Sequence, residues 1–198
     1  SLLARAALSS VYQAQGNQEK AEQELLTMAN AEPDNEELLR VLSNFYIRTS
    51  QIDRVERLYR DRLEKKPGSI LAMQVLAELS FRKGDLQQAR WFTDAILKAA
   101  PNDIQGRFFR ARQLLAEKDY EKAIQLLSSV LDQGPDHAPA YFQLGLLKRA
   151  LGSMNEARVA FKKATELSPT CVAPRLGLAE LYLVTAVYGL AWMEIEKG

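Results

Sequence analysis

Five prolines divide this 198-residue chain into segments of equal length. Each is separated from the next by 34 residues, follows one amphipathic stretch and precedes another: Pro33, Pro67, Pro101, Pro135 and Pro169. A fixed period of this size indicates a repeat architecture. With proline as position 32, the repeats are 2–35, 36–69, 70–103, 104–137 and 138–171, followed by a partial repeat at 172–198.

Three further positions recur in the same frame. Position 8 is always small (Ser9, Ser43, Ala77, Ala111, Gly145, Ala179), and position 20 is alanine or valine (Ala21, Val55, Ala89, Ala123, Ala157, Ala191). Small residues let two helices cross closely. Gly16, Gly84 and Gly152 at position 15 can end a helix in the left-handed conformation. Each repeat is therefore predicted to be helix A, a tight turn and helix B, with proline ending helix B.

The apolar residues have helical spacing, as in Leu39, Leu42 and Phe45, and no strand-like alternation is sustained. The sequence therefore predicts an all-α protein of eleven or twelve antiparallel helices. Isolated helical pairs cannot bury their apolar faces, so the repeats should stack on their neighbours as one α-solenoid domain over residues 1–198, with contacts only between neighbours.

Composition removes most enzyme classes. The formal net charge is +1, and the chain has one histidine, His137, and one cysteine, Cys171. Both end a repeat, about one repeat apart, and are expected to be solvated turn residues rather than a catalytic pair. No phosphate-binding loop and no metal-ligand spacing occurs in the sequence. We therefore expect no enzyme activity, no cofactor and no metal.

The ends suggest a piece of a longer protein, because the chain begins with Ser rather than Met and has no signal-peptide pattern. The longest uncharged run, residues 181–193, is 13 residues long, whereas a membrane span needs about 20. No membrane span is predicted. The sequence is compatible with the cytoplasm or the periplasm.

The fifth repeat resembles the tetratricopeptide repeat family, in a bacterial-type domain, through Tyr141, Leu144, Gly145, Gly152, Ala157, Phe161, Ala164 and Pro169. The resemblance implies a right-handed solenoid. The departures are Ser80 and Thr93 at large apolar positions, Lys148 at position 11, and Arg5, Arg107 and Arg175 at position 4. They predict irregular packing around repeats three and four.

The resemblance also implies a concave groove, lined by positions 2, 5, 6, 9, 12 and 13 of helices A. Helices A carry eleven basic and five acidic residues, a charge of +6 that the net charge conceals. The arginines of residues 54–62 are instead expected to form a salt-bridged solvent face with neighbouring carboxylates. The candidate groove residues are Arg40, Asn44, Ile47, Arg48, Gln74, Glu78, Phe81, Arg82, Phe108, Phe109, Arg112, Phe142, Gln143 and Arg149.

Aromatic rings beside guanidinium groups are typical of interface hot spots. We therefore predict a non-catalytic scaffold that binds an extended or helical, acidic segment of a partner protein. The purely structural interpretation is that Phe108 and Phe142 pack against the next repeat and that the arginines are solvated. The alternative function is a carbohydrate-directed or assembly module of bacterial polysaccharide export machinery. Nucleic-acid binding is disfavoured by the acidic helices B, and the family's carboxylate clamp is missing from the sequence.

The last segment is unusually apolar for the end of a solenoid, which is normally polar. Position 15 is Ala186 instead of glycine. Tyr188, Ala191 and Ile195 are expected to pack on the fifth repeat. The other apolar residues, which are Leu183, Val184, Val187, Leu190, Trp192 and Met193, are expected to form a two-fold homodimer surface.

Overall fold

The computed structural model describes residues 2–196, in which twelve helices and no strands occur. The odd-numbered helices begin 34 residues apart at the predicted repeat starts, so the all-α repeat fold is confirmed. The helices are α1 (Leu2–Ala14), α2 (Gln18–Ala31), α3 (Glu36–Arg48), α4 (Ile52–Lys65), α5 (Ile70–Lys83), α6 (Leu86–Ala99), α7 (Ile104–Ala116), α8 (Tyr120–Gln133), α9 (Ala138–Ala150), α10 (Met154–Leu167), α11 (Val172–Val184) and α12 (Tyr188–Glu196).

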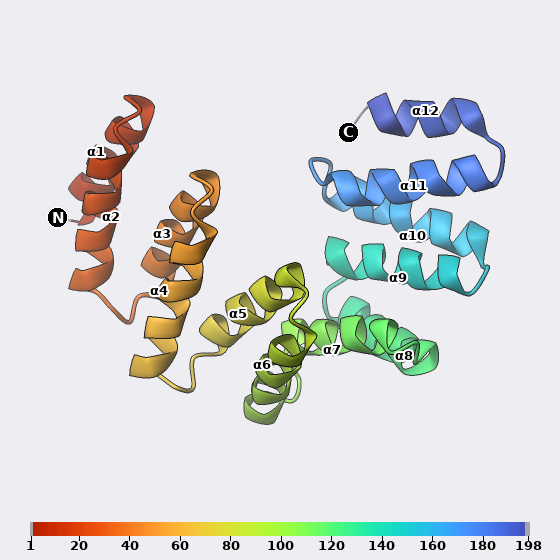
Figure 1. Ribbon diagram of the computed structural model, residues 1–198, viewed down its shortest axis with the longest axis horizontal. Coiled ribbons are helices and arrows are strands. Elements are labelled where there is room, and N and C mark those ends of the chain that lie inside the picture. The colour runs from red at the N-terminus through yellow and green to blue at the C-terminus, as the bar shows by residue number, and fades with distance from the viewer. Residues whose placement is uncertain (1, 197–198) are drawn as a thin grey trace. The chain divides into compact units, whose positions relative to one another are not determined.

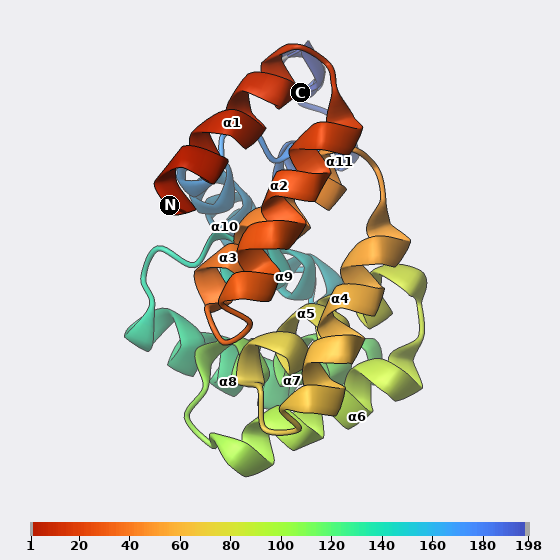
Figure 2. The ribbon, with the colours of Figure 1, turned by 90° about the vertical axis from the view of Figure 1, so that its left-hand side faces the viewer.

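The chain forms two compact units, Ser1–Lys83 and Gly84–Gly198. In the first unit, the hairpins α1–α2 and α3–α4 pack in order and α5 packs on α4 (Figure 1); Figure 2 shows the first hairpin in front. In the second unit, α6 packs on α7, and the hairpins α7–α8, α9–α10 and α11–α12 follow. The expectation of one domain over residues 1–198 stays a prediction.

The turn between helices A and B has the same backbone conformation in every repeat. Position 15 is left-handed throughout: Gly16 (φ 73°), Ser50 (58°), Gly84 (75°), Lys118 (62°), Gly152 (76°) and Ala186 (58°). The prediction for the three glycines is confirmed. The other three residues adopt the same conformation with a side chain, which costs conformational energy that glycine avoids.

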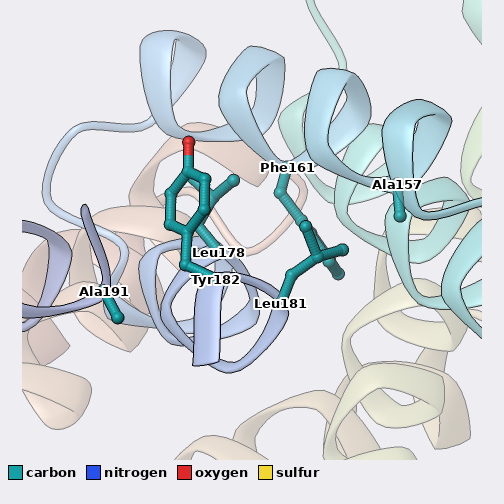
Figure 3. Close-up of a cluster of buried hydrophobic side chains, with 6 residues drawn as sticks. All are labelled: Ala157, Phe161, Leu178, Leu181, Tyr182 and Ala191. Carbon is teal, nitrogen blue, oxygen red and sulfur yellow. The ribbon is translucent and has the colours of Figure 1, made fainter. Parts of the chain in front are cut away.

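The small residues of positions 8 and 20 are buried between the helices of the hairpins. In the fifth repeat, a Cβ on Gly145 would lie 2.5 Å from two ring carbons of Phe161, so the missing side chain makes room for this ring. Phe161 of α10 belongs to a buried cluster with Leu178, Leu181 and Tyr182 of α11 (Figure 3). The core of this unit therefore depends on glycine at position 8 of α9.

Two of the three arginines at position 4, Arg107 and Arg175, stabilise the connections between repeats. The Arg107 Nε donates to the carbonyl oxygen of Pro101 at 3.2 Å, and its Nη1 donates to the Ser129 Oγ at 2.9 Å. The Arg175 Nη2 donates to the Pro169 carbonyl oxygen at 3.0 Å. These guanidinium groups join the preceding turn to their own repeat, so they have a structural role.

The polar residues at large apolar positions are buried with hydrogen-bond partners. The Ser80 and Thr93 hydroxyls each donate to the carbonyl oxygen four residues earlier, at 2.7 Å. The Gln113 Nε2 of α7 also donates to the Thr93 Oγ1 of α6, at 3.1 Å. Because buried hydroxyls need partners, this pair of residues fixes the packing of α6 on α7 without a large apolar side chain at position 93.

Candidate partner-binding surfaces

In the first unit, the candidate residues of α3 share one exposed face. Arg40, Asn44, Ile47 and Arg48 recur at helical spacing and are exposed. The Arg48 Nη2 donates to the Gln13 Oε1 at 3.0 Å, which joins the ends of α3 and α1. Exposed guanidinium groups can bind carboxylates, and the binding of a partner by this face stays a prediction.

The candidate residues of α5 are more buried and less basic. Gln74, Glu78 and Phe81 are half-buried, whereas Arg82 is exposed. The Arg82 Nε donates to the Glu78 Oε1 at 3.4 Å. The only charge-bearing candidates of this helix thus compensate one another, and α5 contributes little positive potential.

In the second unit, Phe108 and Phe109 of α7 are buried, with 5% and 3% exposure. They lie in the helix packing, so the sequence prediction that they face a partner is corrected here. Arg112 lies with its guanidinium carbon 5.8 Å from the centre of the Phe108 ring. The half-buried Arg112 therefore lies next to the ring at this part of the predicted groove.

The candidate residues of α9 are half-buried. The Phe142 ring lies 5.9 Å from the Phe161 ring, so one side of it packs on α10. Gln143 is half-buried on the same helix. Arg149 forms an ion pair with Glu180 of α11, which brings the two helices A together. The packing interpretation of Phe142 thus holds in part, and its contact with a partner stays a prediction.

An apolar strip extends across α9 and α11, at positions 5 and 9 of the fifth repeat and positions 5 and 12 of the sixth. Phe142 and Leu146 are half-buried on α9, while Leu176 and Leu183 on α11 are each 50% exposed. Three of these four residues are missing from the predicted groove. The sequence frame could have indicated Leu176 and Leu183, because they occupy positions 5 and 12 of the sixth repeat, which are groove positions.

Ion pairs between helices A and B offset part of the predicted cationic charge. They join Arg5 to Glu24, Lys83 to Glu56, Arg110 to Asp94 and Lys148 to Glu156. The excess of +6 on helices A therefore overstates the potential that a partner meets. Pairing between helices far apart in sequence is invisible to a count of residues.

The arginines of α4 only partly form the expected solvent face. Arg54 pairs with Glu22 and Arg60 with Glu56. Arg62, however, is buried, and its Nη1 donates to the Pro33 carbonyl oxygen at 2.8 Å and the Asp34 Oδ1 at 2.9 Å. The prediction is wrong for Arg62, which is a packing residue.

The apolar face of α12 is largely exposed. Ala191 is buried as predicted, but Tyr188 and Ile195 are 67% and 47% exposed, so the prediction that they pack on the fifth repeat is wrong. Trp192 is 62% exposed. The turn and helix around them expose Val184, Val187, Leu190 and Met193 as well. This surface is a second candidate interface.

A mainly apolar groove of about 560 Å³ lies between α9 and α10. We call it the α9–α10 groove. Its floor and rim are formed by Tyr141, Leu144, Lys148, Asn155, Glu156, Val159, Ala160 and Lys163. The sequence prediction did not include it. These residues lie at positions 4, 7 and 11 of helix A and on the facing part of helix B.

His137 caps α9 rather than standing in solvent. Its Nδ1 accepts the Ala140 N–H at 3.1 Å, its Nε2 lies 3.2 Å from the Gln105 Nε2, and its ring is 4.9 Å from the Phe108 ring. Burial lowers the pKa of His137. The prediction of a solvated residue is therefore wrong for His137 but confirmed for Cys171, which is exposed.

Neither a metal-binding cluster nor a membrane-spanning helix occurs among the described residues. Among residues 2–196, no group of three or more His, Cys, Asp or Glu side chains is placed to hold a metal ion. None of the helices in that range is long and apolar enough to cross a membrane.

The hairpins, their 34-residue period and the small residues at positions 8 and 20 define a helical-repeat protein of the solenoid class. A tetratricopeptide repeat family model matches residues 114–159. Residues 114–159 thus match the family that the sequence resembles, and similar solved structures include tetratricopeptide repeat proteins. Proteins of this kind generally act as protein–protein interaction scaffolds.

Solved structures share the fold along the whole chain. A tetratricopeptide repeat protein from Parabacteroides merdae has a TM-score of 0.65 and 20% identity, over 99% of this chain and 78% of that one. The Cut9–Hcn1 complex of APC/C contains a chain with a TM-score of 0.77 and 16% identity, over 100% of this chain and 39% of that one. At these identities the likeness shows the fold alone.

Curated relatives match over small parts of their own length. Human protein O-mannosyl-transferase TMTC1 is 23% identical over 178 residues, which are 88% of this chain and 20% of that protein. Human superkiller complex protein 3 is 33% identical over 72 residues, 36% of this chain and 5% of that protein. The bovine SGT1 homolog is 36% identical over 76 residues, 38% of this chain and 22% of that protein.

Proposed function

We propose that the chain is a non-catalytic scaffold whose second unit binds an acidic, amphipathic helix of a partner protein. The observation that carries this proposal is the apolar strip of Phe142, Leu146, Leu176 and Leu183 across α9 and α11. Apolar helix anchors recur at i, i+3, i+4 and i+7, which suits a groove of this kind.

The charges beside the strip support an acidic partner. Arg149 lies on α9 and Arg112 on α7, at neighbouring positions of the repeat frame. The Glu180 that pairs with Arg149 is exposed, and exposed ion pairs are worth about 1 kcal/mol or less. A carboxylate of the partner can therefore compete with Glu180 for the Arg149 guanidinium group, which binds carboxylates with two parallel hydrogen bonds.

The first unit offers a smaller surface of the same chemistry. Arg40, Asn44 and Arg48 of α3 support contact with further carboxylates of a partner. The alternative of a carbohydrate-directed module is not carried forward. The strip in residues 2–196 consists mainly of aliphatic side chains, whereas sugar binding favours exposed aromatic faces, and Phe142 packs on Phe161.

Two fluorescent peptides with the same i, i+4, i+7 leucines test the proposal, one with glutamates and one with lysines at the flanks. We expect the acidic peptide to bind more tightly in anisotropy titrations. Leu176→Glu and Arg149→Glu should each weaken its binding at least tenfold. Arg158→Glu is the matched control, because Arg158 is exposed on α10 outside the apolar strip and its Nη2 donates to the nearby Asn155 Oδ1 at 3.3 Å.

Far-UV circular dichroism verifies that each variant is folded. Equal binding of both peptides would remove the claim of an acidic partner. Unchanged binding by Leu176→Glu would show that the strip is not the site.

We also propose that the chain self-associates through the exposed apolar face of α12, as a two-fold dimer. Exposed apolar patches on a protein surface mark interfaces, and Tyr188, Trp192 and Met193 form such a surface on a single helix. Sedimentation velocity over a wide concentration range should show a dimer that Trp192→Glu abolishes. A parent protein that stays monomeric at every concentration would contradict this proposal and leave the peptide-binding proposal intact.

A further inference from the structure

Two apolar surfaces of the second unit have no role in the partner-binding strip: the α9–α10 groove and the outer face of α12. We propose that α12 of one copy docks into the α9–α10 groove of a second copy. The inference rests on the proposed self-association and specifies which surface α12 meets. It is carried by the size of the groove, the spacing of the side chains on both surfaces and their complementary charge.

The groove exists because the front of the fifth repeat is incompletely covered. At positions 4, 7 and 11, the second repeat buries Leu39, Leu42 and Tyr46. The fifth repeat has Tyr141, Leu144 and Lys148 at these positions, and all three are only half-buried. Val159 on the facing α10 is 66% exposed. A volume of about 560 Å³ lies within the range of specific binding pockets, about 300–1,000 Å³.

The outer face of α12 carries a row of side chains opposite its buried side. Ala191 is buried, whereas Tyr188 and Trp192 are exposed and one turn apart. The Trp192 Nε1 donates to the Glu196 Oε1 at 2.7 Å, so Glu196 continues the row. Tyr188, Trp192 and Glu196 thus form a row at i, i+4 and i+8, with two aromatic rings followed by a carboxylate.

A row of matching length borders the groove on α10. Asn155, Val159 and Lys163 also lie at i, i+4 and i+8. At a rise of about 1.5 Å per residue, each row is about 12 Å long. With the two helices parallel, Trp192 of one copy meets Val159 of the other, and Glu196 meets Lys163.

The charges of the two surfaces are complementary. The outer face of α12 carries the Glu196 carboxylate, and the described residues of this helix include no basic side chain; Glu194 is half-buried and pairs with Arg175 of α11. The groove residues include Lys148 and Lys163 against the single carboxylate of Glu156. Lys163 lies 3.8 Å from Glu166, an exposed pair that Glu196 of another copy can replace. A second copy therefore satisfies both the apolar and the ionic parts of the groove.

Sedimentation velocity with three single variants tests the contact. We expect Val159→Glu and Trp192→Glu each to raise the dissociation constant of the parent assembly at least tenfold. Trp91→Glu is the matched control, because Trp91 is 63% exposed on α6, away from both surfaces in the repeat frame, and should associate as the parent does. Circular dichroism verifies the fold of each variant.

Charge reversal gives a second, specific readout. Lys163→Glu and Glu196→Lys should each weaken association alone, because like charges then face one another. An equimolar mixture of the two should regain parent-like association, because one contact of the mixed pair has the native charges and the other has them exchanged.

The outcomes separate this contact from self-association in general. If the parent associates but Val159→Glu associates equally and the mixture shows no recovery, the α9–α10 groove is not the docking site, while self-association stands. If the parent remains monomeric, both proposals about self-association fail and the binding of acidic peptides is unaffected.

Discussion

Gly145→Ala tests the packing between α9 and α10 at its tightest point. The added Cβ would lie 2.5 Å from the Cδ1 and Cε1 atoms of Phe161, whereas carbon atoms prefer about 3.5–4.0 Å. Phe161 is fully buried against Leu178 and Leu181, so the ring has little room to move (Figure 3). Overpacking costs about 1–3 kcal/mol, and the higher helix propensity of alanine returns about 1 kcal/mol. Because two contacts would be as short as 2.5 Å, the cost falls in the upper part of this range, and we expect a net loss of about 1–2 kcal/mol.

Urea denaturation followed by circular dichroism measures this loss, and amide hydrogen exchange of α9–α12 shows whether it is local, as expected when stability is a sum of neighbour terms. Gly189→Ala is the matched control, because a Cβ there meets no atom within 4 Å, and it should be neutral or stabilising. Phe161→Leu combined with Gly145→Ala should cost less than the sum of the single changes. A Gly145→Ala protein as stable as the parent would refute the packing argument.

Four further substitutions have expected outcomes. Residues 118 and 152 both have a left-handed backbone conformation, which glycine adopts at lower cost than other residues. Lys118→Gly should therefore raise the free energy of unfolding by about 1 kcal/mol, and Gly152→Ala should lower it by a similar amount. Urea denaturation midpoints measure both changes. His137 has a lowered pKa, and its neutral Nδ1 caps α9. Its contribution to stability is therefore present above its unfolded pKa of about 6.5 and is lost as the pH falls through the folded pKa. His137→Asn should flatten the dependence of the thermal midpoint on pH between about 7.5 and 5. Arg107→Met should cost about 1–2 kcal/mol, measured by urea denaturation, because hydrogen bonds to Pro101 and Asn102 of the inter-repeat turn and to Ser129 of α8 are lost.

The repeat frame was predictable because local chemistry and packing agree at the same positions. Proline ends helix B wherever the period places it, and glycine at positions such as 16 and 152 can take the left-handed conformation of the turn. The small residue at position 8 is required by the close crossing of the two helices, as Gly145 shows. These requirements recur in every repeat, so the six repeats predict the same helix boundaries.

The binding surface was less predictable, because a repeat position does not determine exposure. Position 5 is exposed as Arg40, buried as Phe108, half-buried as Phe142 and half-exposed as Leu176. The neighbours decide the outcome, since His137, which ends the same repeat and caps α9, packs on the Phe108 ring. Likewise, the ion pair between Arg110 and Asp94 joins residues of different repeats, so a count of charges on helices A could not reveal it.

Lys148 departs from the repeat pattern at position 11, and this departure accounts for the α9–α10 groove. Position 11 is a buried tyrosine in the second and sixth repeats, Tyr46 and Tyr182. Lys148 cannot fill the same volume with an apolar ring, and its ammonium group instead lies 2.5 Å from the Glu156 carboxylate at the surface. The apolar side chains of Leu144 and Val159 then remain accessible beside a positive charge. A single polar substitution at a packing position thus converts a closed repeat front into an apolar, basic-rimmed groove, which is the combination that an acidic aromatic helix can fill.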